Sequence, residues 1–341
     1  MKPLSRIICA ACIALLATGS LSAPASGQAD EKLVWPYGPA NPRVEFVKTF
    51  ARAEDMGIKK GFFARFKDLL FGEKESYLVR PMAVTTSGGV VYVADPGAQG
   101  VHRFDAAGGD YSLLSAGEDA PLPSPVGLAR GSDGDVYVTD SKLAQVFVIH
   151  RGAKAAEPLR LQAQLAQPTG IAFDSASGRL YVADTADHRI LIFARDGKLT
   201  GSIGQRGSGD GEFNYPTYLW RTPQGRLYVT DSLNFRIQVF DERGGFVGKF
   251  GRQGDGTGDA ARPKGVALDR YGHIYVVDAL FHALQIFDDS GRLLLPVGER
   301  GSARGEFWLP TGLFIDDDDT IYVADSYNKR VQVLRYIGGA A

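Results

Sequence analysis

The sequence predicts an all-β fold, a six-bladed β-propeller with four strands in each blade. One hairpin pattern recurs six times, and its fourth copy, LYVTDSLNFRIQVF from Leu227 to Phe240, has two apolar, β-branched runs on either side of a polar loop. An aspartate ends the first run of every copy, and these aspartates follow one another at spacings of 45, 44, 47, 47 and 47 residues. A fixed period in this range is typical of solenoids and propellers.

Each repeat divides into four strands. The first follows a proline, as in PTGIAFD from Pro168, the second and third form the hairpin, and FVGKF from Phe246 to Phe250 is an example of the fourth. The opening prolines are Pro81, Pro125, Pro168, Pro216, Pro263 and Pro310. Strands such as Ile190 to Phe193 are apolar on both faces, as expected when each sheet is packed between two neighbours. The six repeats cover residues 81–334.

An N-terminal strand is expected to close the propeller domain, which we assign to residues 43–341. The last repeat ends without a fourth strand, whereas RVEFVKTF at 43–50 alternates apolar and polar residues and resembles FVGKF. We therefore expect residues 43–50 to complete the last blade. This closure removes sheet edges that would otherwise be exposed to aggregation.

Residues 1–29 have the pattern of a secretory signal peptide. Two basic residues precede an apolar run from Ile7 to Leu16, and small residues follow up to a cleavage site after Ala29. Cys9 and Cys12, the two cysteines of the chain, lie in this run, so the exported protein has no disulfide. We expect an exported protein, periplasmic or extracellular.

Two further segments lie outside the repeats. Residues 30–42 contain three prolines and are expected to be an extended linker rather than a strand or helix. The insertion at 52–75 is expected to contain a short helix from Phe62 to Phe71 with its apolar residues on one face. We favour packing of this helix onto the propeller, and the alternative is a docking helix for a membrane or a partner protein.

The charge balance argues against nucleic acid as a partner. Residues 1–29 contain two of the 38 basic side chains and none of the acidic ones, which leaves 36 basic and 39 acidic side chains in the exported chain. Surfaces that bind nucleic acid are usually strongly basic. We expect a monomer that does not bind nucleic acid.

The repeat motifs resemble those of the NHL repeat family. The shared features are PxGIAxD in the first strand, YVADSxNxRIQVF in the hairpin, and glycine-rich linkers such as GQRGSGDGEFNYP from Gly204 and GERGSARGEFWLP from Gly298. The resemblance covers Pro81 to Leu334 and implies a six-bladed β-propeller. It leaves the function open, because one fold hosts many activities.

Antiparallel connectivity places the hairpin loops and the glycine-rich linkers on one face, around the central channel. We expect a protein or small ligand to bind on this face. Candidate residues occupy positions that vary between the hairpin loops or follow the opening prolines: Lys142, His188, Phe235, His282, Tyr327, Lys329, Lys264 and Thr311.

The aspartates that recur in every blade are expected to be structural and to accept hydrogen bonds from loop backbone groups. They are Asp95, Asp140, Asp184, Asp231, Asp278 and Asp325. Because a unique site should lie where the blades differ, these aspartates are not site candidates.

Blade four is unusual, since Tyr218 and Trp220 stand where other blades mostly have small residues. Their side chains either fill space in the core between the sheets or form an aromatic wall for a ligand near the channel, and the sequence does not decide between the two.

The histidines give only a weak signal for a metal centre, and no cofactor is predicted. Amidating lyases that resemble this family use several histidines around zinc, and lactonase-like propellers use acidic and amide side chains around calcium. His188 and His282 occupy equivalent loop positions two blades apart but have no third partner, so they are weak zinc candidates. The acids at 316–319 lack the alternate spacing of a calcium loop and are interpreted as a solvated turn on the opposite face.

We therefore expect an exported propeller that acts as a protein- or ligand-binding interaction module. No complete catalytic constellation accompanies the repeats. The alternative is a metal-dependent lyase or a lactonase-like hydrolase that uses the central channel, with zinc or calcium bound there.

Overall fold

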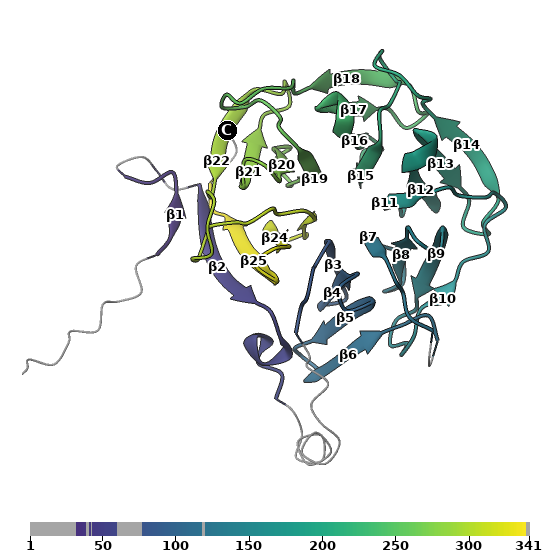
Figure 1. The fold of residues 1–341 in the computed structure, drawn as a ribbon, viewed down its shortest axis with the longest axis horizontal. Coiled ribbons are helices and arrows are strands. Elements are labelled where there is room, and N and C mark those ends of the chain that lie inside the picture. The colour runs from purple at the N-terminus through teal and green to yellow at the C-terminus, as the bar shows by residue number, and fades with distance from the viewer. Residues whose placement is uncertain (1–31, 39–40, 42, 60–76, 118–119, 339–341) are drawn as a thin grey trace, which may run out of the picture. The chain divides into compact units, whose positions relative to one another are not determined.

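The computed structural model describes residues 32–38, 41, 43–59, 77–117 and 120–338, and these form a closed ring of six antiparallel sheets (Figure 1). Five sheets have four strands, and the sixth has five. The prediction of a six-bladed, all-β propeller is thus confirmed. Among the described residues, no helix is both long and apolar enough to cross a membrane.

The strands of the first three blades follow in chain order. Blade 1 comprises β3 (Ala83–Ser87), β4 (Val90–Asp95), β5 (Gly100–Asp105) and β6 (Asp110–Leu114). Blade 2 comprises β7 (Pro125–Arg130), β8 (Val136–Asp140), β9 (Gln145–Ile149) and the two-residue β10 (Glu157–Pro158). Blade 3 comprises β11 (Pro168–Asp174), β12 (Arg179–Asp184), β13 (Arg189–Phe193) and β14 (Leu199–Ile203).

The last three blades repeat the arrangement. Blade 4 comprises β15 (Pro216–Arg221), β16 (Leu227–Asp231), β17 (Arg236–Phe240) and β18 (Phe246–Phe250). Blade 5 comprises β19 (Pro263–Leu268), β20 (Ile274–Asp278), β21 (Ala283–Phe287) and β22 (Leu293–Val297). Blade 6 comprises β23 (Leu313–Ile315), β24 (Thr320–Asp325), β25 (Arg330–Tyr336), β2 (Val44–Phe50) and β1 (Val34–Trp35). Short 3-10 helices occupy Ala53–Met56 (η1), Thr185–Asp187 (η2) and Ser232–Asn234 (η3).

The hydrophobic core is divided into six clusters, one between each pair of neighbouring blades. The cluster between blades 3 and 4, for example, contains Tyr181 and Ile190 from one sheet and Val229 and Phe240 from the other. Each of the other five clusters likewise combines buried side chains from two adjacent sheets. Both faces of each sheet are therefore buried, which explains the apolar strands of the sequence.

Glycine allows the inner strands to approach one another where the sheets converge. A Cβ atom at Gly170 on β11 would overlap the carbonyl oxygen of Thr217 on β15, and one at Gly312 would overlap the backbone of blade 1 at Met82. Glycine at these two positions therefore keeps the innermost strands narrow enough to pack.

The N-terminal strand closes the ring as predicted. β2 pairs antiparallel with β25, from Val44 opposite Tyr336 to Phe50 opposite Val331.

The expectation that residues 30–42 form an extended linker without a strand is wrong at one place, because Val34–Trp35 form the short strand β1 on the outer edge of β2. Trp35 is 4 % exposed and packs into the cluster between blades 5 and 6, and this burial explains why the segment is ordered as a strand. The helix expected from Phe62 to Phe71 lies outside the described residues.

Phe50 links the closing strand to blade 1, and its truncation tests the closure. The side chain is fully buried, and its ring meets that of Phe104 edge-on at 5.4 Å. We expect Phe50→Ala to lower the free energy of unfolding by about 3 to 5 kcal/mol, because it leaves a cavity at the seam of the ring. Val47→Ala, on the same strand but 38 % exposed, should cost less than about 0.5 kcal/mol. Urea unfolding measures both, and equal losses would contradict this role of Phe50.

Candidate functional site

The hairpin loops and the glycine-rich linkers share one face of the ring, as predicted. We call it the hairpin-loop face; its loops are residues 96–99, 141–144, 185–188, 232–235, 279–282 and 326–329. In blade 4 the Asn234 side chain donates to the carbonyl of Gly207 at 2.9 Å, and Arg236 donates to that of Gly209 at 2.7 Å. In blade 6 Asn328 donates to Gly301 at 2.8 Å. Each of these hydrogen bonds joins a hairpin to the linker that precedes its blade.

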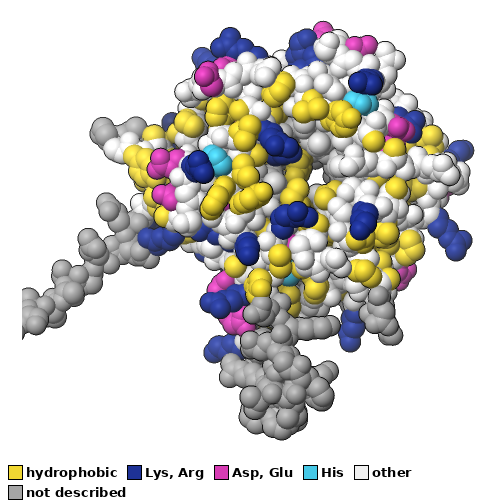
Figure 2. Space-filling view, in the orientation of Figure 1, with side chains coloured by type: hydrophobic (Ala, Val, Ile, Leu, Met, Phe, Trp, Pro, Cys, Tyr) yellow, Lys and Arg dark blue, Asp and Glu magenta, His cyan; other side chains and the backbone are white. Residues whose placement is uncertain are grey.

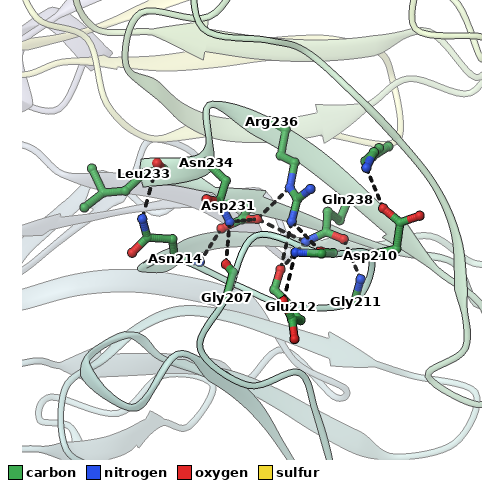
Figure 3. A network of polar contacts seen from close by, with 12 residues as sticks. Gly207, Asp210, Gly211, Glu212, Asn214, Asp231, Leu233, Asn234, Arg236 and Gln238 are labelled. Atoms are coloured by element: carbon green, nitrogen blue, oxygen red, sulfur yellow. Dashed lines mark hydrogen bonds and ion pairs between the residues drawn. The ribbon is translucent and has the colours of Figure 1, made fainter.

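The repeated aspartates fix these loops, which confirms their predicted structural role. All six are fully buried. Figure 3 shows that the Asp231 carboxylate accepts hydrogen bonds from the backbone N–H of Asn214 at 2.7 Å, from Arg236 Nε at 2.8 Å and from Gln238 Nε2 at 3.0 Å. In the other five blades, backbone groups of the segment that enters the blade also donate to the aspartate: Val79 and Arg80 (Asp95), Ser124 (Asp140), Ala166 and Gln167 (Asp184), Ala261 and Arg262 (Asp278), and Trp308 (Asp325).

A residue with left-handed backbone conformation ends every hairpin loop, and no residue pattern in these loops indicates it. The residues and their φ angles are Gln99 (55°), Ala144 (52°), His188 (54°), Phe235 (56°), His282 (55°) and Lys329 (55°). Glycine usually fills such positions, and none of the six is glycine. Four of the residues proposed as site candidates (His188, Phe235, His282 and Lys329) are therefore also turn residues of the scaffold.

His188 and His282 use one ring nitrogen to hold the next linker. His188 Nδ1 accepts the backbone N–H of Tyr215 at 3.1 Å, and His282 Nδ1 accepts that of Leu309 at 3.1 Å. Burial lowers the pKa of His282, and the neighbouring Arg300 lowers it further. No group of three or more His, Cys, Asp or Glu side chains that could hold a metal ion occurs among the described residues. The pair therefore does not fit a zinc site, and both histidines have a scaffold contact instead.

The remaining candidates lie on the same face with different degrees of exposure. Lys142 and Lys329 are exposed, and Tyr327 is 59 % exposed. Lys264 on β19 is partly buried, and its desolvation lowers the pKa of its ammonium group to about 8, with a smaller effect of Arg262 in the same direction. Thr311 is buried and donates to the carbonyl of Pro81 at 3.3 Å, which joins blade 6 to blade 1.

Tyr218 crosses the central channel. It lies on β15 in blade 4, and its hydroxyl donates to the Met82 carbonyl, 3.4 Å away in blade 1, on the opposite side of the ring. Burial raises the pKa of its hydroxyl group. Tyr218 thus connects the inner strands of two opposite blades across the channel.

A cavity of about 730 Å³ opens on the opposite face, beyond Tyr218 along the inner strands. Trp220 of blade 4 and Phe314 of blade 6 form an aromatic wall there, with ring centroids 5.8 Å apart. Trp220 also packs against three core clusters, those between blades 4 and 5, blades 5 and 6, and blades 6 and 1. Both interpretations left open for this residue, core packing and an aromatic wall, therefore agree with its position.

Three arginine–aspartate pairs surround this cavity. Arg221 pairs with Asp174 at 3.0 Å, Arg270 with Asp319 at 2.5 Å, and Arg130 with Asp317 at 2.8 and 2.9 Å. The turn at 316–319 does lie opposite the hairpin loops, but its interpretation as a solvated turn is only partly correct. Asp317 is exposed, whereas Asp319 is 4 % exposed and paired. Sequence reasoning missed these pairs because their members lie in different repeats.

Two family models match parts of the chain. The NHL repeat model matches residues 165–193 and 307–334, and a model described as a 6-bladed beta-propeller matches residues 218–281. Together with the ring of six sheets, these matches define the class: the chain is a six-bladed β-propeller. The NHL repeat model matches two of its six repeats, those of blades 3 and 6.

Curated relatives match over a short segment. The peptidylglycine alpha-amidating monooxygenases of Rattus norvegicus and Mus musculus are each 32 % identical over 113 residues. The match covers 29 % of this chain and 12 % of each relative, so the chain spans only a small part of their length.

Solved structures share the fold at low identity. Virginiamycin B lyase from Staphylococcus aureus is 18 % identical with a TM-score of 0.55, over 76 % of this chain and 96 % of that one. A structural genomics protein of unknown function from Bacteroides thetaiotaomicron is 17 % identical with a TM-score of 0.61, over 86 % of this chain and 75 % of that one. At these identities the similarity establishes the fold alone.

Neutralising Asp231 tests the structural role of the repeated aspartates. We expect Asp231→Asn to lower the free energy of unfolding by roughly 3 to 5 kcal/mol, because it leaves the buried Arg236 guanidinium without its counter-charge. Asp210→Asn, which breaks the exposed pair with Lys249 nearby, should cost less than about 1 kcal/mol. Chemical unfolding measures the free energy of unfolding of both variants. A loss of less than about 1 kcal/mol in Asp231→Asn would show that the Asp231–Arg236 pair is dispensable.

The lowered pKa of His282 predicts that the fold loses stability in acid. In the unfolded chain His282 takes up a proton at its ordinary pKa near 6.5, whereas in the folded chain its pKa is lower. The contribution of neutral His282 to folding stability is therefore present above pH 6.5 and is lost as the pH falls below it. We expect His282→Asn, which tolerates the left-handed turn, to reduce the drop in Tm between pH 7.5 and pH 5.5. His150→Asn, at an exposed position, is the control, and the same drop in all three proteins would rule out His282 as a source of acid sensitivity.

Proposed function

We propose that the protein is a binding module that docks a partner protein on its hairpin-loop face. The observation that carries this proposal is a set of large apolar side chains exposed on the loops and linkers of blades 4 to 6. They are Tyr215 (41 %), Leu233 (51 %), Leu280 (50 %), Trp308 (42 %) and Tyr327 (59 %). Trp308 and Tyr327 are neighbours, with ring centroids 6.0 Å apart. Exposed apolar clusters of this kind are typical of interaction surfaces, in which Trp and Tyr contribute much of the binding energy.

The charges on this face favour an acidic partner. The six repeated aspartates are fully buried, and Asp187 in the loop of blade 3 is paired with Arg189, whereas Lys142 and Lys329 are exposed in the loops. Arg300 lies over the Trp308 ring at 6.0 Å. In Figure 2, Lys and Arg side chains lie among hydrophobic ones around the central opening. A partner surface with apolar residues surrounded by carboxylates complements this pattern, because opposite potentials guide association and suppress other partners.

Export is part of the proposal. Residues 1–29 have the pattern of a secretory signal peptide, so the partner would be an envelope or extracellular protein. Cell fractionation with an antibody against the propeller tests this point, and a cytoplasmic location of the uncleaved chain would contradict it.

A metal-dependent lyase is the alternative function. It is favoured by the 32 % identity over 113 residues to the amidating monooxygenases and by the fold shared with virginiamycin B lyase. Under this alternative the protein would show metal-dependent turnover that is lost in His188→Ala or His282→Ala. The backbone hydrogen bonds that both histidines accept make this the weaker of the two proposals.

Site-specific photo-crosslinking tests the docking surface. A photoreactive side chain at position 280 should give a defined adduct with an envelope protein, whereas one at Tyr271, which lines the cavity on the opposite face and is 44 % exposed, should not. We expect the adduct to weaken several-fold in a Lys142→Glu/Lys329→Glu variant and at high salt, since the attraction is electrostatic. Arg195→Glu, at an exposed pair outside the hairpin loops, is the matched control. Equal adduct yields from positions 280 and 271 would count against the proposal. So would an adduct yield that stays unchanged when the two lysines are replaced.

A further inference from the structure

The cavity on the opposite face has one arginine that a ligand can use. Arg221 is 4 % exposed, its aspartate is 11 % exposed, and its guanidinium stacks over the Tyr181 ring at 4.9 Å. Arg270 is held through Asp319, which also accepts the Arg270 backbone N–H at 3.1 Å. Both of these pairs are fixed by burial or by additional hydrogen bonds.

The Arg130–Asp317 pair differs from the other two. It joins blade 2 to blade 6, which are not neighbours, and its side chains are 40 % and 80 % exposed. Within the described residues, Arg130 is the only hydrogen-bond donor to the Asp317 carboxylate. Exposed ion pairs typically contribute little to stability, so another carboxylate can replace Asp317 at little cost.

From this geometry we infer that the cavity binds a small organic carboxylate with an apolar body, whose carboxylate takes the place of Asp317 on Arg130. The guanidinium presents two parallel N–H groups, which match a carboxylate in a bidentate pair. The same guanidinium lies 6.0 Å from the centre of the Phe314 ring, and Phe314 packs against Trp220. The charged group and the apolar body of such a ligand would therefore lie side by side.

The size and the apolar lining of the cavity agree with this ligand class, and the other four aspartates of the lining already accept hydrogen bonds from the chain. About 730 Å³ is within the range of small-molecule sites. Aliphatic side chains such as Ile171 and Leu219 line the cavity next to the aromatic wall. The site is separate from the hairpin-loop face, so the inference does not depend on the docking proposal.

Calorimetry with matched pairs of probes tests the site. The probes are 3-phenylpropionate, indole-3-acetate and octanoate, each compared with its neutral amide at low salt. We expect at least one carboxylate to bind at least about tenfold more tightly than its amide, since a charge-assisted hydrogen bond is worth about 1.5 to 3 kcal/mol. Binding of no carboxylate, or equal binding of a carboxylate and its amide, would overturn the inference.

Two variants test the exchange itself. Asp317→Asn removes the internal competitor and should tighten binding of the carboxylate several-fold, whereas Arg130→Gln should abolish the preference over the amide. Both changes are at exposed positions, and thermal unfolding checks that the fold is kept. Arg195→Gln breaks a comparable exposed pair away from the cavity and should leave binding unchanged. Weaker binding by Asp317→Asn would contradict the displacement of Asp317.

Discussion

A buried carboxylate in each blade holds this propeller together. The aspartate that ends the second strand accepts backbone N–H groups from the segment that enters the blade, so one side chain fixes the hairpin, the linker and the inner strand together. Because carboxylates are costly to bury, they remain ionised inside a protein only when donors surround them. In blades 3, 4 and 6 an arginine supplies a further donor, through Arg189, Arg236 and Arg330. In blade 5, where alanine stands at the corresponding position, backbone groups of Leu280 and Phe281 donate instead.

Much of the fold was predictable because it depends on local patterns that repeat. The six regularly spaced aspartates predicted the number of blades. The absence of a fourth strand from the last repeat predicted that β2 pairs with β25. The left-handed residues were not predictable, since position 144 holds alanine and position 329 holds lysine, and neither residue type indicates positive φ. The short strand β1 was missed because three nearby prolines outweighed the burial of Trp35.

The candidate sites were less predictable than the fold for a physical reason. The hairpin-loop face follows from strand order, so its residues could be named from the sequence. The cavity depends on pairs that form only when the ring closes: Arg130 and Asp317 are 187 residues apart, and Tyr218 meets Met82 from the opposite blade. The aromatic residues of blade 4 were visible as exceptions to the repeat. Their partners were not, because the curvature of the ring determines which blades face each other.

The central claim is that the hairpin loops form a scaffold and a docking surface rather than a metal centre. Elemental analysis of the protein purified without chelators tests it most directly. The account predicts no metal at a stoichiometry near one per chain, because one ring nitrogen of His188 and one of His282 already accept a backbone N–H, and no third ligand accompanies the pair among the described residues. One zinc or calcium ion per chain, lost when either histidine is replaced, would contradict the account and would support the lyase alternative.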